Sequence, residues 1–232
     1  MSNEVYTENI ELLLENFFIT IPSGTVEMRD DRIKEKWTET ISSFQLAKYP
    51  VTQKLYKAVI GKNPATFKGD NKPVETVSWV EAVRFCNVLS EHFGLTPCYL
   101  FQKNSEILFK PKANGYRLPT EAEWQYSCQE GTGEIRYGQL SEIAWYKDNS
   151  DRQLHEVGRK LPNKWGLFDM LGNTWEWCSN IYDEAVYGSY RILRGGGWCD
   201  EERSVMATAR RRSHPNDFKI DDLGFRIAKN NS

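Results

Sequence analysis

A chain of 232 residues with nearly balanced charge excludes several classes of protein before any motif is considered. Its 30 Lys and Arg residues against 32 Asp and Glu residues give a formal net charge of −2, so we expect no nucleic-acid partner. No apolar run approaches the roughly 18 residues that a membrane-spanning helix needs. Apolar residues make up 40% of the chain and include 8 Trp and 11 Tyr, which predicts a globular core with large aromatic contact surfaces.

The N-terminal residues predict a short lead-in followed by strands. We assign residues 1–15 to the lead-in and residues 16–232 to a single domain, because the chain contains no internal repeat and no linker rich in Pro, Gly and Ser. Residues 17–26 are rich in β-forming side chains and are interrupted at Pro22-Ser23-Gly24, which predicts two strands joined by a turn. The stretch from Thr38 to Tyr49 also has the composition of a strand.

Three amphipathic helices are predicted from N-cap residues and from apolar residues at helical spacing. The first lies between Thr52 and Gly61, and the second begins at Ser78 and stops at Gly94. The third begins at Thr120. The second and third helices start with the pattern of a capping box, in which a Glu side chain three residues on binds the amide of the N-cap residue.

Helical periodicity disappears after Gly131. The remaining residues, about a hundred, predict short aromatic-rich strands separated by Gly, Asn and Asp. The chain is therefore predicted to be α+β, with helices confined to its middle and with much irregular structure.

The cysteines do not indicate a metal site or a disulfide framework. The chain has five of them, with no CxxC pair and no zinc-ligand spacing, and their odd number leaves at least one unpaired. Cys86 and Cys128 lie on the apolar faces of the second and third predicted helices. We predict that both are buried free thiols.

Four segments together carry a family signature. They are Gly115 to Trp124, Trp165 to Trp177, Arg194 to Trp198 and Leu223 to Arg226. In this order they closely resemble the formylglycine-generating-enzyme, or sulfatase-modifying-factor, family, and with the stretch Ile21 to Gly24 the match covers roughly residues 16–228. The resemblance implies a C-type-lectin-like fold of the formylglycine-generating-enzyme type, with a ligand site built by the C-terminal segment.

The glycines before Trp198 fit that implication physically. Gly195, Gly196 and Gly197 permit backbone conformations and close approaches that side chains would block, and Trp198 then supplies a large anchor. The residues between Trp198 and the final motif, called segment 199–222 below, have a different and mostly polar character.

The resemblance argues against catalysis. Family members that oxidise a sulfatase cysteine use two cysteines, two and seven positions after the conserved Trp, which bind copper and react with the substrate thiol. This chain has Asp200 and Val205 at those positions, and Cys199 is displaced by one residue and has no partner. We therefore predict a protein that is not an enzyme, with a copper-dependent formylglycine-generating oxidase as the alternative.

Other catalytic chemistries have still less support in the sequence. A second enzymatic branch of the family forms carbon–sulfur bonds with a non-haem iron held by histidines of an additional helical domain. This chain has only His92, His155 and His214, none at the spacing of one helical turn. It also lacks a GxSxG elbow, a phosphate-binding glycine loop and an HExxH helix.

Segment 199–222 is the predicted binding surface. Val205, Ala207 and Ala209 alternate and are expected to point inward along one strand, with the remaining side chains of the segment facing solvent. The predicted ligand-binding residues are Cys199, Asp200, Glu201, Arg203, Ser204, Met206, Thr208, Arg211, Arg212, Ser213, His214, Asn216, Asp217, Phe218, Lys219, Ile220, Asp221 and Asp222.

The segment is similar to that of one subgroup of the family, the variable proteins of diversity-generating retroelements, including treponemal members. In that subgroup the C-terminal segment is rewritten at adenines, often in AAC codons. Most residue types of segment 199–222 are reachable from such codons, whereas Glu201, Glu202, Met206 and Lys219 are not. Phe218 and Ile220 lie among charges where a stable fold has no evident use for them, which also favours a diversified surface.

The ligand that this surface predicts is a protein. Exposed Phe and Arg side chains often dominate binding energy in protein interfaces, and the broad surface has few concave signals of a small-molecule site. An alternative is a non-catalytic structural adaptor with no variable site. No sequence feature specifies an oligomeric state.

The resemblance also bears on a metal and on location. Asp169, Gly172, Thr174 and Glu176 align with family positions that bind calcium, which implies a calcium site with Asp169 and Glu176 as its carboxylates. The alternative is that both carboxylates accept hydrogen bonds from backbone amides of a long loop. We expect a cell-surface protein of the lipoprotein kind, as several variable proteins are, although the start of this sequence shows neither a leader nor a lipobox.

Overall fold

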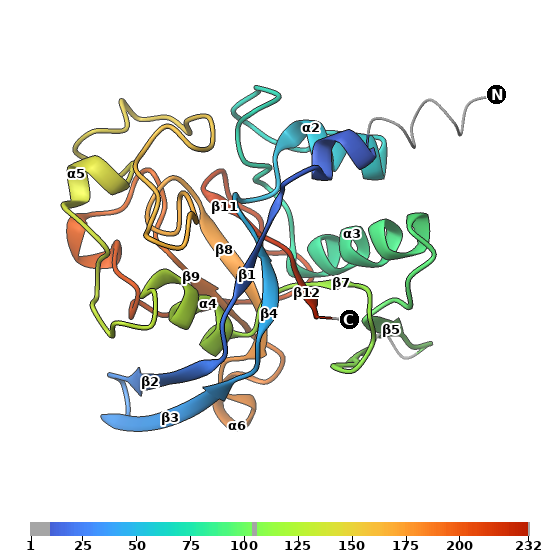
Figure 1. Cartoon of the computed structure of the whole chain (residues 1–232), viewed down its shortest axis with the longest axis horizontal. Coiled ribbons are helices and arrows are strands. Elements are labelled where there is room, and N and C mark those ends of the chain that lie inside the picture. Colours follow the sequence, from blue (N-terminus) through green and yellow to red (C-terminus); the bar gives the residue numbers. More distant parts are fainter. Residues whose placement is uncertain (1–9, 104–105, 232) are drawn as a thin grey trace.

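The computed structural model describes residues 10–103 and 106–231, so the first nine residues of the expected lead-in lie outside it. Figure 1 shows short helices and strands joined by long irregular loops, as the α+β prediction required. The elements are β1 (Phe18–Ile21), β2 (Gly24–Asp30), β3 (Glu35–Ile41), β4 (Phe44–Ala47), α2 (Gln53–Ile60), α3 (Trp79–His92), β5 (Tyr99–Phe101), β6 (Ile107–Phe109), β7 (Tyr116–Arg117), α4 (Glu121–Cys128), α5 (Leu140–Ile143), β8 (Trp175–Ile181), α6 (Glu184–Tyr187), β9 (Arg191–Arg194), the 3-10 helix η1 (Glu202–Ser204), β10 (Arg211–Ser213), β11 (Leu223–Gly224) and β12 (Ala228–Asn230).

Two four-stranded sheets organise the chain. In the first, ordered β1-β4-β12-β7, the C-terminal strand β12 lies between β4 and β7, with Ala228 opposite both Leu46 and Arg117. In the second, ordered β10-β9-β8-β11, the two-residue strand β11 runs parallel to β8. Strand β10 belongs to segment 199–222 and β11 directly follows it, so the second sheet holds the segment at two places.

The expected strands near the N-terminus are present, with one difference. The stretch from Thr38 to Tyr49 is not continuous, because β3 ends at Ile41 and β4 begins at Phe44. Between them the Ser43 hydroxyl donates to the carbonyl of Ile21 at 2.8 Å. That bond fixes the turn from the β2–β3 hairpin into the first sheet.

The three predicted helices are confirmed, together with their caps. The Thr52 hydroxyl accepts a bond from an amide of α2, and Gly61 ends that helix with φ +81°. Both predicted capping boxes are formed, at Ser78 for α3 and at Thr120 for α4. Two one-turn helices after Gly131, α5 and α6, were not predicted, because four residues are too few to reveal a helical period.

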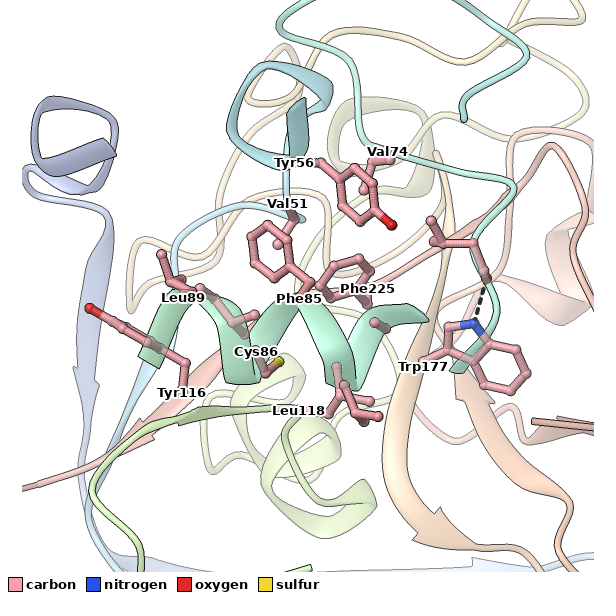
Figure 2. Packing of buried hydrophobic residues seen from close by; sticks show 14 of the residues in the cluster. Val51, Tyr56, Val74, Phe85, Cys86, Leu89, Tyr116, Leu118, Trp177 and Phe225 are labelled. Atoms are coloured by element: carbon pink, nitrogen blue, oxygen red, sulfur yellow. Dashed lines mark hydrogen bonds between the residues drawn. The ribbon is translucent and has the colours of Figure 1, made fainter. Parts of the chain in front are cut away.

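One apolar cluster joins α2 and α3 to the C-terminal strands (Figure 2). The Tyr56 ring stacks on Phe85 with centroids 5.4 Å apart, and Phe225 meets Phe85 edge-on at 5.3 Å. Trp177 Nε1 donates to the carbonyl of Val77 at 3.0 Å, which satisfies the polar atom of a fully buried ring. Burying an aromatic side chain stabilises a fold by about 1.5–3 kcal/mol, so Phe225 is a firm anchor just beyond segment 199–222.

The cysteines are free, as predicted for Cys86 and Cys128. Both are fully buried, and burial raises the pKa of each thiol above its ordinary value. A thiol that stays protonated and out of contact with solvent is chemically inert. Cys199 is the exposed one among the five.

Candidate functional site

Segment 199–222 leaves the second sheet through a turn that requires glycine. Gly195 has φ +101° and Gly196 has φ +83°, in the region that side chains disfavour. A Cβ atom on Gly197 would lie 2.5 Å from Asp222 Oδ2. The start and the end of the segment therefore lie against each other, and the predicted role of these glycines is confirmed. The Trp198 indole closes the turn by donating to the carbonyl of Asp221 at 3.2 Å.

A buried arginine binds the backbone of the segment. Arg194 Nη1 donates to the carbonyls of Ala207 and Ala209, at 3.0 and 2.8 Å. Arg194 is fully buried and its Nε lies 3.2 Å from Glu121 Oε1. The prediction of a strand through Val205, Ala207 and Ala209 is therefore wrong. The carbonyls of Ala207 and Ala209 accept bonds from a guanidinium, and the residues form bends and turns. Val205 and Ala207 are nevertheless buried, as expected.

A second arginine holds η1. Arg136 Nε donates to the carbonyl of Val205 at 3.1 Å, and its Nη2 donates to the carbonyl of Glu202 at 2.7 Å. Backbone bonds from outside the segment add to this. They join Lys147 N to Asp200 O, Ala207 N to Ile135 O, Val80 N to Pro215 O, Thr76 N to Ile220 O and Trp175 N to Asp222 O. The path of the segment thus depends mainly on its own main chain and on groups of the surrounding fold.

Most of the predicted ligand-binding side chains reach solvent, but three do not. Asp200, Ser213 and Asp222 are 7%, 9% and 3% exposed, which corrects the expectation that they face solvent. The exposed residues are Cys199, Glu201, Arg203, Arg211, Asn216, Asp217 and Lys219. The half-buried residues are Ser204, Met206, Thr208, Arg212, His214, Phe218, Ile220 and Asp221.

The fold does use Phe218 and Ile220, contrary to the expectation from their charged neighbours. Both are half-buried and pack against the apolar cluster of α2 and α3. Between them, Lys219 Nζ lies 2.8 Å from Glu81 Oε2 at the start of α3. Alternation along an extended chain therefore places two apolar side chains inward and the lysine outward.

Asp200 is a structural carboxylate. Its Oδ2 accepts bonds from Trp175 Nε1 at 2.5 Å and from the Gly197 amide at 2.8 Å, and its Oδ1 lies 3.1 Å from Arg211 Nη2. These contacts explain its burial, because a carboxylate is stable in the interior only when it is paired and hydrogen-bonded. The Arg211 guanidinium also lies 4.7 Å from the centroid of the Trp175 ring.

Cys199 is held in its protonated form. Its Sγ donates to Asp222 Oδ2 at 3.2 Å. Partial burial and the nearby carboxylates of Asp222, Asp200 and Asp221 raise the pKa of this thiol to about 12. Burial and the same acidic neighbours raise the pKa of Asp222 to about 6. An exposed thiol with so high a pKa is a poor nucleophile and a poor metal ligand.

Three adjoining hollows run along β2 next to segment 199–222. The largest, about 650 Å³, lies between the β2–β3 hairpin and α4, with Trp37 and Tyr182 in its lining. The middle one, about 290 Å³, is lined partly by Arg203, Met206 and Thr208 of the segment. The third, about 360 Å³, lies beyond it toward the end of α4. Neighbouring hollows share lining residues, which places the three next to one another along β2.

Two groups that sequence reasoning missed contribute to this region. Arg29 of β2 lines the middle and third hollows, and Tyr182 lines the largest and middle hollows. The Arg212 guanidinium lies 4.9 Å from the centroid of Tyr182 and 3.8 Å from that of Tyr187. The charged run at residues 29–32 was the one signal in the sequence that could have pointed to β2.

Asp169 and Glu176 do not fit a shared calcium site. Both Glu176 oxygens face Arg226, at 2.7 and 2.8 Å from its Nη2 and Nε, and Trp124 Nε1 also donates to Glu176 at 2.7 Å. Asp169 Oδ2 instead accepts a bond from the Gly158 amide at 2.7 Å. A fully buried guanidinium occupies the place where a cation would bind Glu176. The alternative of bonds to backbone amides thus describes Asp169 and not Glu176.

Comparison with known proteins decides the family. Residues 9–231 match the sulfatase-modifying factor enzyme 1-like domain. The chain belongs to this family. It is 33% identical over 223 residues to the chaperone protein LppX of Paenibacillus barcinonensis, covering 80% of this chain and 78% of that protein. It is 26% identical over 222 residues to the inactive C-alpha-formylglycine-generating enzyme 2 of Bos taurus, covering 87% of this chain and 64% of that protein.

Solved structures agree on the fold. Variable protein 1 of Treponema denticola superposes with a TM-score of 0.81 and is 30% identical, covering 92% of this chain and 94% of that one. CarF superposes with a TM-score of 0.74 and is 25% identical, covering 93% and 98%. The predicted formylglycine-generating-enzyme type of C-type-lectin-like fold is confirmed, as is the likeness to a variable protein. No helix in the described part of the chain is long and apolar enough to cross a membrane.

Proposed function

We propose that this protein is a non-catalytic binding protein, in which segment 199–222 presents exchangeable side chains on a fixed scaffold. The observation that supports this proposal most strongly is that groups of the surrounding fold form hydrogen bonds with the main chain of the segment. Arg136 and Arg194 bind its carbonyls, and backbone groups outside the segment bind it at five more places. A main chain held in this way keeps its path when exposed side chains such as Arg203 and Asp217 are replaced.

The chemistry near Trp198 supports a non-catalytic role. Asp200 and Val205 are at the positions where the resemblance implies the catalytic cysteines, and both are buried in structural contacts. The neighbouring Cys199 thiol, with its pKa raised to about 12, neither replaces the missing thiolate nor has a second sulfur beside it. The relative named as inactive accords with this reading, although other relatives are named as enzymes.

The likeness to a variable protein supports the second half of the proposal. It covers 92% of this chain at 30% identity, which is too much for segment 199–222 to lie wholly outside the compared region. We further propose that the partner is a protein, because the exposed arginines and the half-buried Phe218 offer the side chains that dominate many protein interfaces. A location at the cell surface follows from such a role.

Sequencing the gene and its flanking DNA tests the diversification. The proposal expects a near-copy of the coding region for residues 199–222, differing mainly at adenines, together with a gene for a reverse transcriptase. A locus with neither would contradict it. Ser213 and Asp222, which are buried, should vary less among copies than the exposed Asn216 and Asp217.

A turnover assay tests the catalytic alternative. Purified protein loaded with copper is incubated with a sulfatase peptide that carries the target cysteine, and mass spectrometry measures conversion to formylglycine. We expect no conversion, with an active formylglycine-generating enzyme as the positive control. Turnover would establish the oxidase instead. An adaptor without a variable site would keep its partner when Arg203, Arg212 and Asp217 are all replaced by Ser.

A further inference from the structure

The middle of the three hollows has an unusual concentration of arginines. Arg29 and Arg32 enter it from the β2–β3 hairpin, and Arg203 and Arg210 enter it from the chain after Trp198. Its only carboxylates among the described residues are Asp30 and Asp31. Among the lining residues alone, four arginines therefore face two aspartates, whereas the whole chain has a net charge of −2.

Two of these arginines have carboxylate partners whose side chains are mostly shielded from solvent. Arg210 Nη1 donates to Asp30 Oδ2 at 2.6 Å, and Arg210 Nε donates to Glu121 Oε1 at 2.6 Å. Arg32 Nη2 donates to Asp183 Oδ2 at 2.6 Å. A ligand can therefore recruit only the other two arginines of the hollow, whose carboxylate partners are more exposed.

Arg29 and Arg203 have only solvent-exposed partners. Arg29 Nη2 lies 3.2 Å from Asp31 Oδ2, whose side chain is 75% exposed. Arg203 Nε lies 3.1 Å from Glu201 Oε2, and the Arg203 side chain is 83% exposed. Ion pairs at such exposure contribute little and rearrange readily, so both guanidiniums can turn to a ligand.

Two buried polar atoms at the hollow point to the kind of ligand. Arg29 Nε and Thr208 Oγ1 are shielded from solvent and have no hydrogen-bond partner among the residues that the structure describes. Both residues line the middle hollow and its smaller neighbour. Arg29 Nε–H can only donate, and the Thr208 hydroxyl can donate. Buried donors without acceptors are rare in folded proteins, so the missing partner is an acceptor atom.

We infer that this hollow binds an oxyanion of the ligand, a carboxylate or a phosphate group, through Arg29 and Thr208, which turn their shielded Nε and Oγ1 atoms toward it, with Arg203 at its edge. The inference rests on the proposed function in one respect, because Arg203 and Thr208 belong to segment 199–222. Arg29 belongs to the scaffold. A diversified segment would thus vary its own contacts while Arg29 stays constant. The constant charge of Arg29 selects ligands with acidic or phosphorylated side chains.

Isothermal titration of the full chain with two probes, inorganic phosphate and a triglutamate peptide, tests this inference. We expect weak saturable binding of at least one probe to the unmodified protein. Arg29→Met should weaken it about tenfold, as loss of a charge-assisted bond predicts. Thr208→Val keeps the side-chain shape and should weaken it about threefold. Arg84→Met is the matched control, because this exposed arginine stacks on Phe101 beside α3, away from β2 (Figure 1).

The outcomes separate the sources of the oxyanion and the two proposals. Binding of the peptide alone assigns a carboxylate, and binding of phosphate as well assigns a general oxyanion site. Equal affinity of wild type and Arg29→Met, or equal loss in Arg84→Met, would overturn the inference, as would no binding of either probe. Circular dichroism confirms that each variant is folded. A missing template repeat at the gene would defeat the proposed diversification without changing these affinities.

Discussion

Strand β8 and strand β10 of segment 199–222 belong to one sheet, but β8 and the segment are held in opposite ways. In β8, Trp175, Glu176 and Trp177 are fully buried, and their side chains make the contacts that fix the strand. In segment 199–222 the main chain makes most of these contacts, with Arg136 and Arg194 as partners. A stretch held by its side chains loses stability when its sequence changes. A stretch held by its main chain tolerates such changes.

The largest expected effect is at the buried ion pair of the scaffold. Replacing Arg226 with Met leaves the fully buried Glu176 carboxylate with Trp124 as its remaining donor and removes bonds to four carbonyls. Loss of one partner from such a pair costs about 3–5 kcal/mol. Urea unfolding should therefore show a decrease of this size in the free energy of unfolding.

The double variant Arg226→Met with Glu176→Gln is its control. It removes the unpaired charge and should recover part of the lost stability. If the free energy of unfolding of the single variant lies within about 1 kcal/mol of the wild-type value, the stability of β8 does not depend on this pair.

Asp222 is a residue of segment 199–222 that should behave like the scaffold, and it makes stability depend on pH. Its pKa is raised to about 6, so the folded protein binds this proton more tightly than the unfolded chain does. The resulting stabilisation is complete below about pH 4 and is lost as the pH rises through 6. The groups that act on it are Cys199, Asp200, Asp221 and Arg211.

Replacing Asp222 with Asn removes this dependence. Unfolding measured from pH 3.5 to pH 8 should show the variant about 1–3 kcal/mol more stable than wild type at pH 8 and equally stable at pH 3.5. Asp169, whose pKa burial also raises to about 6, is present in both proteins and cancels in the difference. A constant difference across the pH range would contradict the assignment.

A smaller effect is expected where the scaffold holds the main chain of the segment. Arg136→Met removes the bonds to Glu202 and Val205 at the surface, which should lower the free energy of unfolding by about 1–2 kcal/mol. Hydrogen exchange should rise in residues 202–205. Arg159→Met, which breaks only an exposed pair with Glu156, is the control and should change stability by less than about 0.5 kcal/mol.

The smallest effect is expected from calcium. Because Arg226 satisfies Glu176, adding calcium or the chelator EGTA should leave the melting temperature unchanged. A rise of several degrees with calcium, lost in Asp169→Asn, would show that a site forms with a geometry other than the one described.

Local and motif-based features of the fold could be predicted from the sequence. The capping boxes at Ser78 and Thr120 join residues three apart, so the pattern alone specifies them. The family motifs predicted the fold, and the glycines before Trp198 predicted the turn. The break between β3 and β4 depends on a bond from Ser43 to Ile21, which no local pattern reveals.

The interior of the site could not be predicted, because it depends on contacts between distant residues. Charged residues are usually exposed, and the burial of Asp200 and Asp222 follows from Trp175 and the glycine turn. The small residues that alternate at 205–209 predict a strand. In the folded chain, Arg194 instead donates to the carbonyls of Ala207 and Ala209. Arg29 meets the segment only in the folded chain.

Replacing exposed side chains of segment 199–222 shows whether its main chain stays in place without them. The combined variant changes four residues to Ser, namely Glu201, Arg203, Asn216 and Asp217. Hydrogen exchange then reports on the amides of Thr76, Val80, Lys147 and Trp175, which donate to carbonyls of the segment. If the main chain holds the segment, protection stays within about threefold of wild type at all four amides. Loss of protection by about a hundredfold or more at these amides, with the rest of the protein still folded, would contradict it.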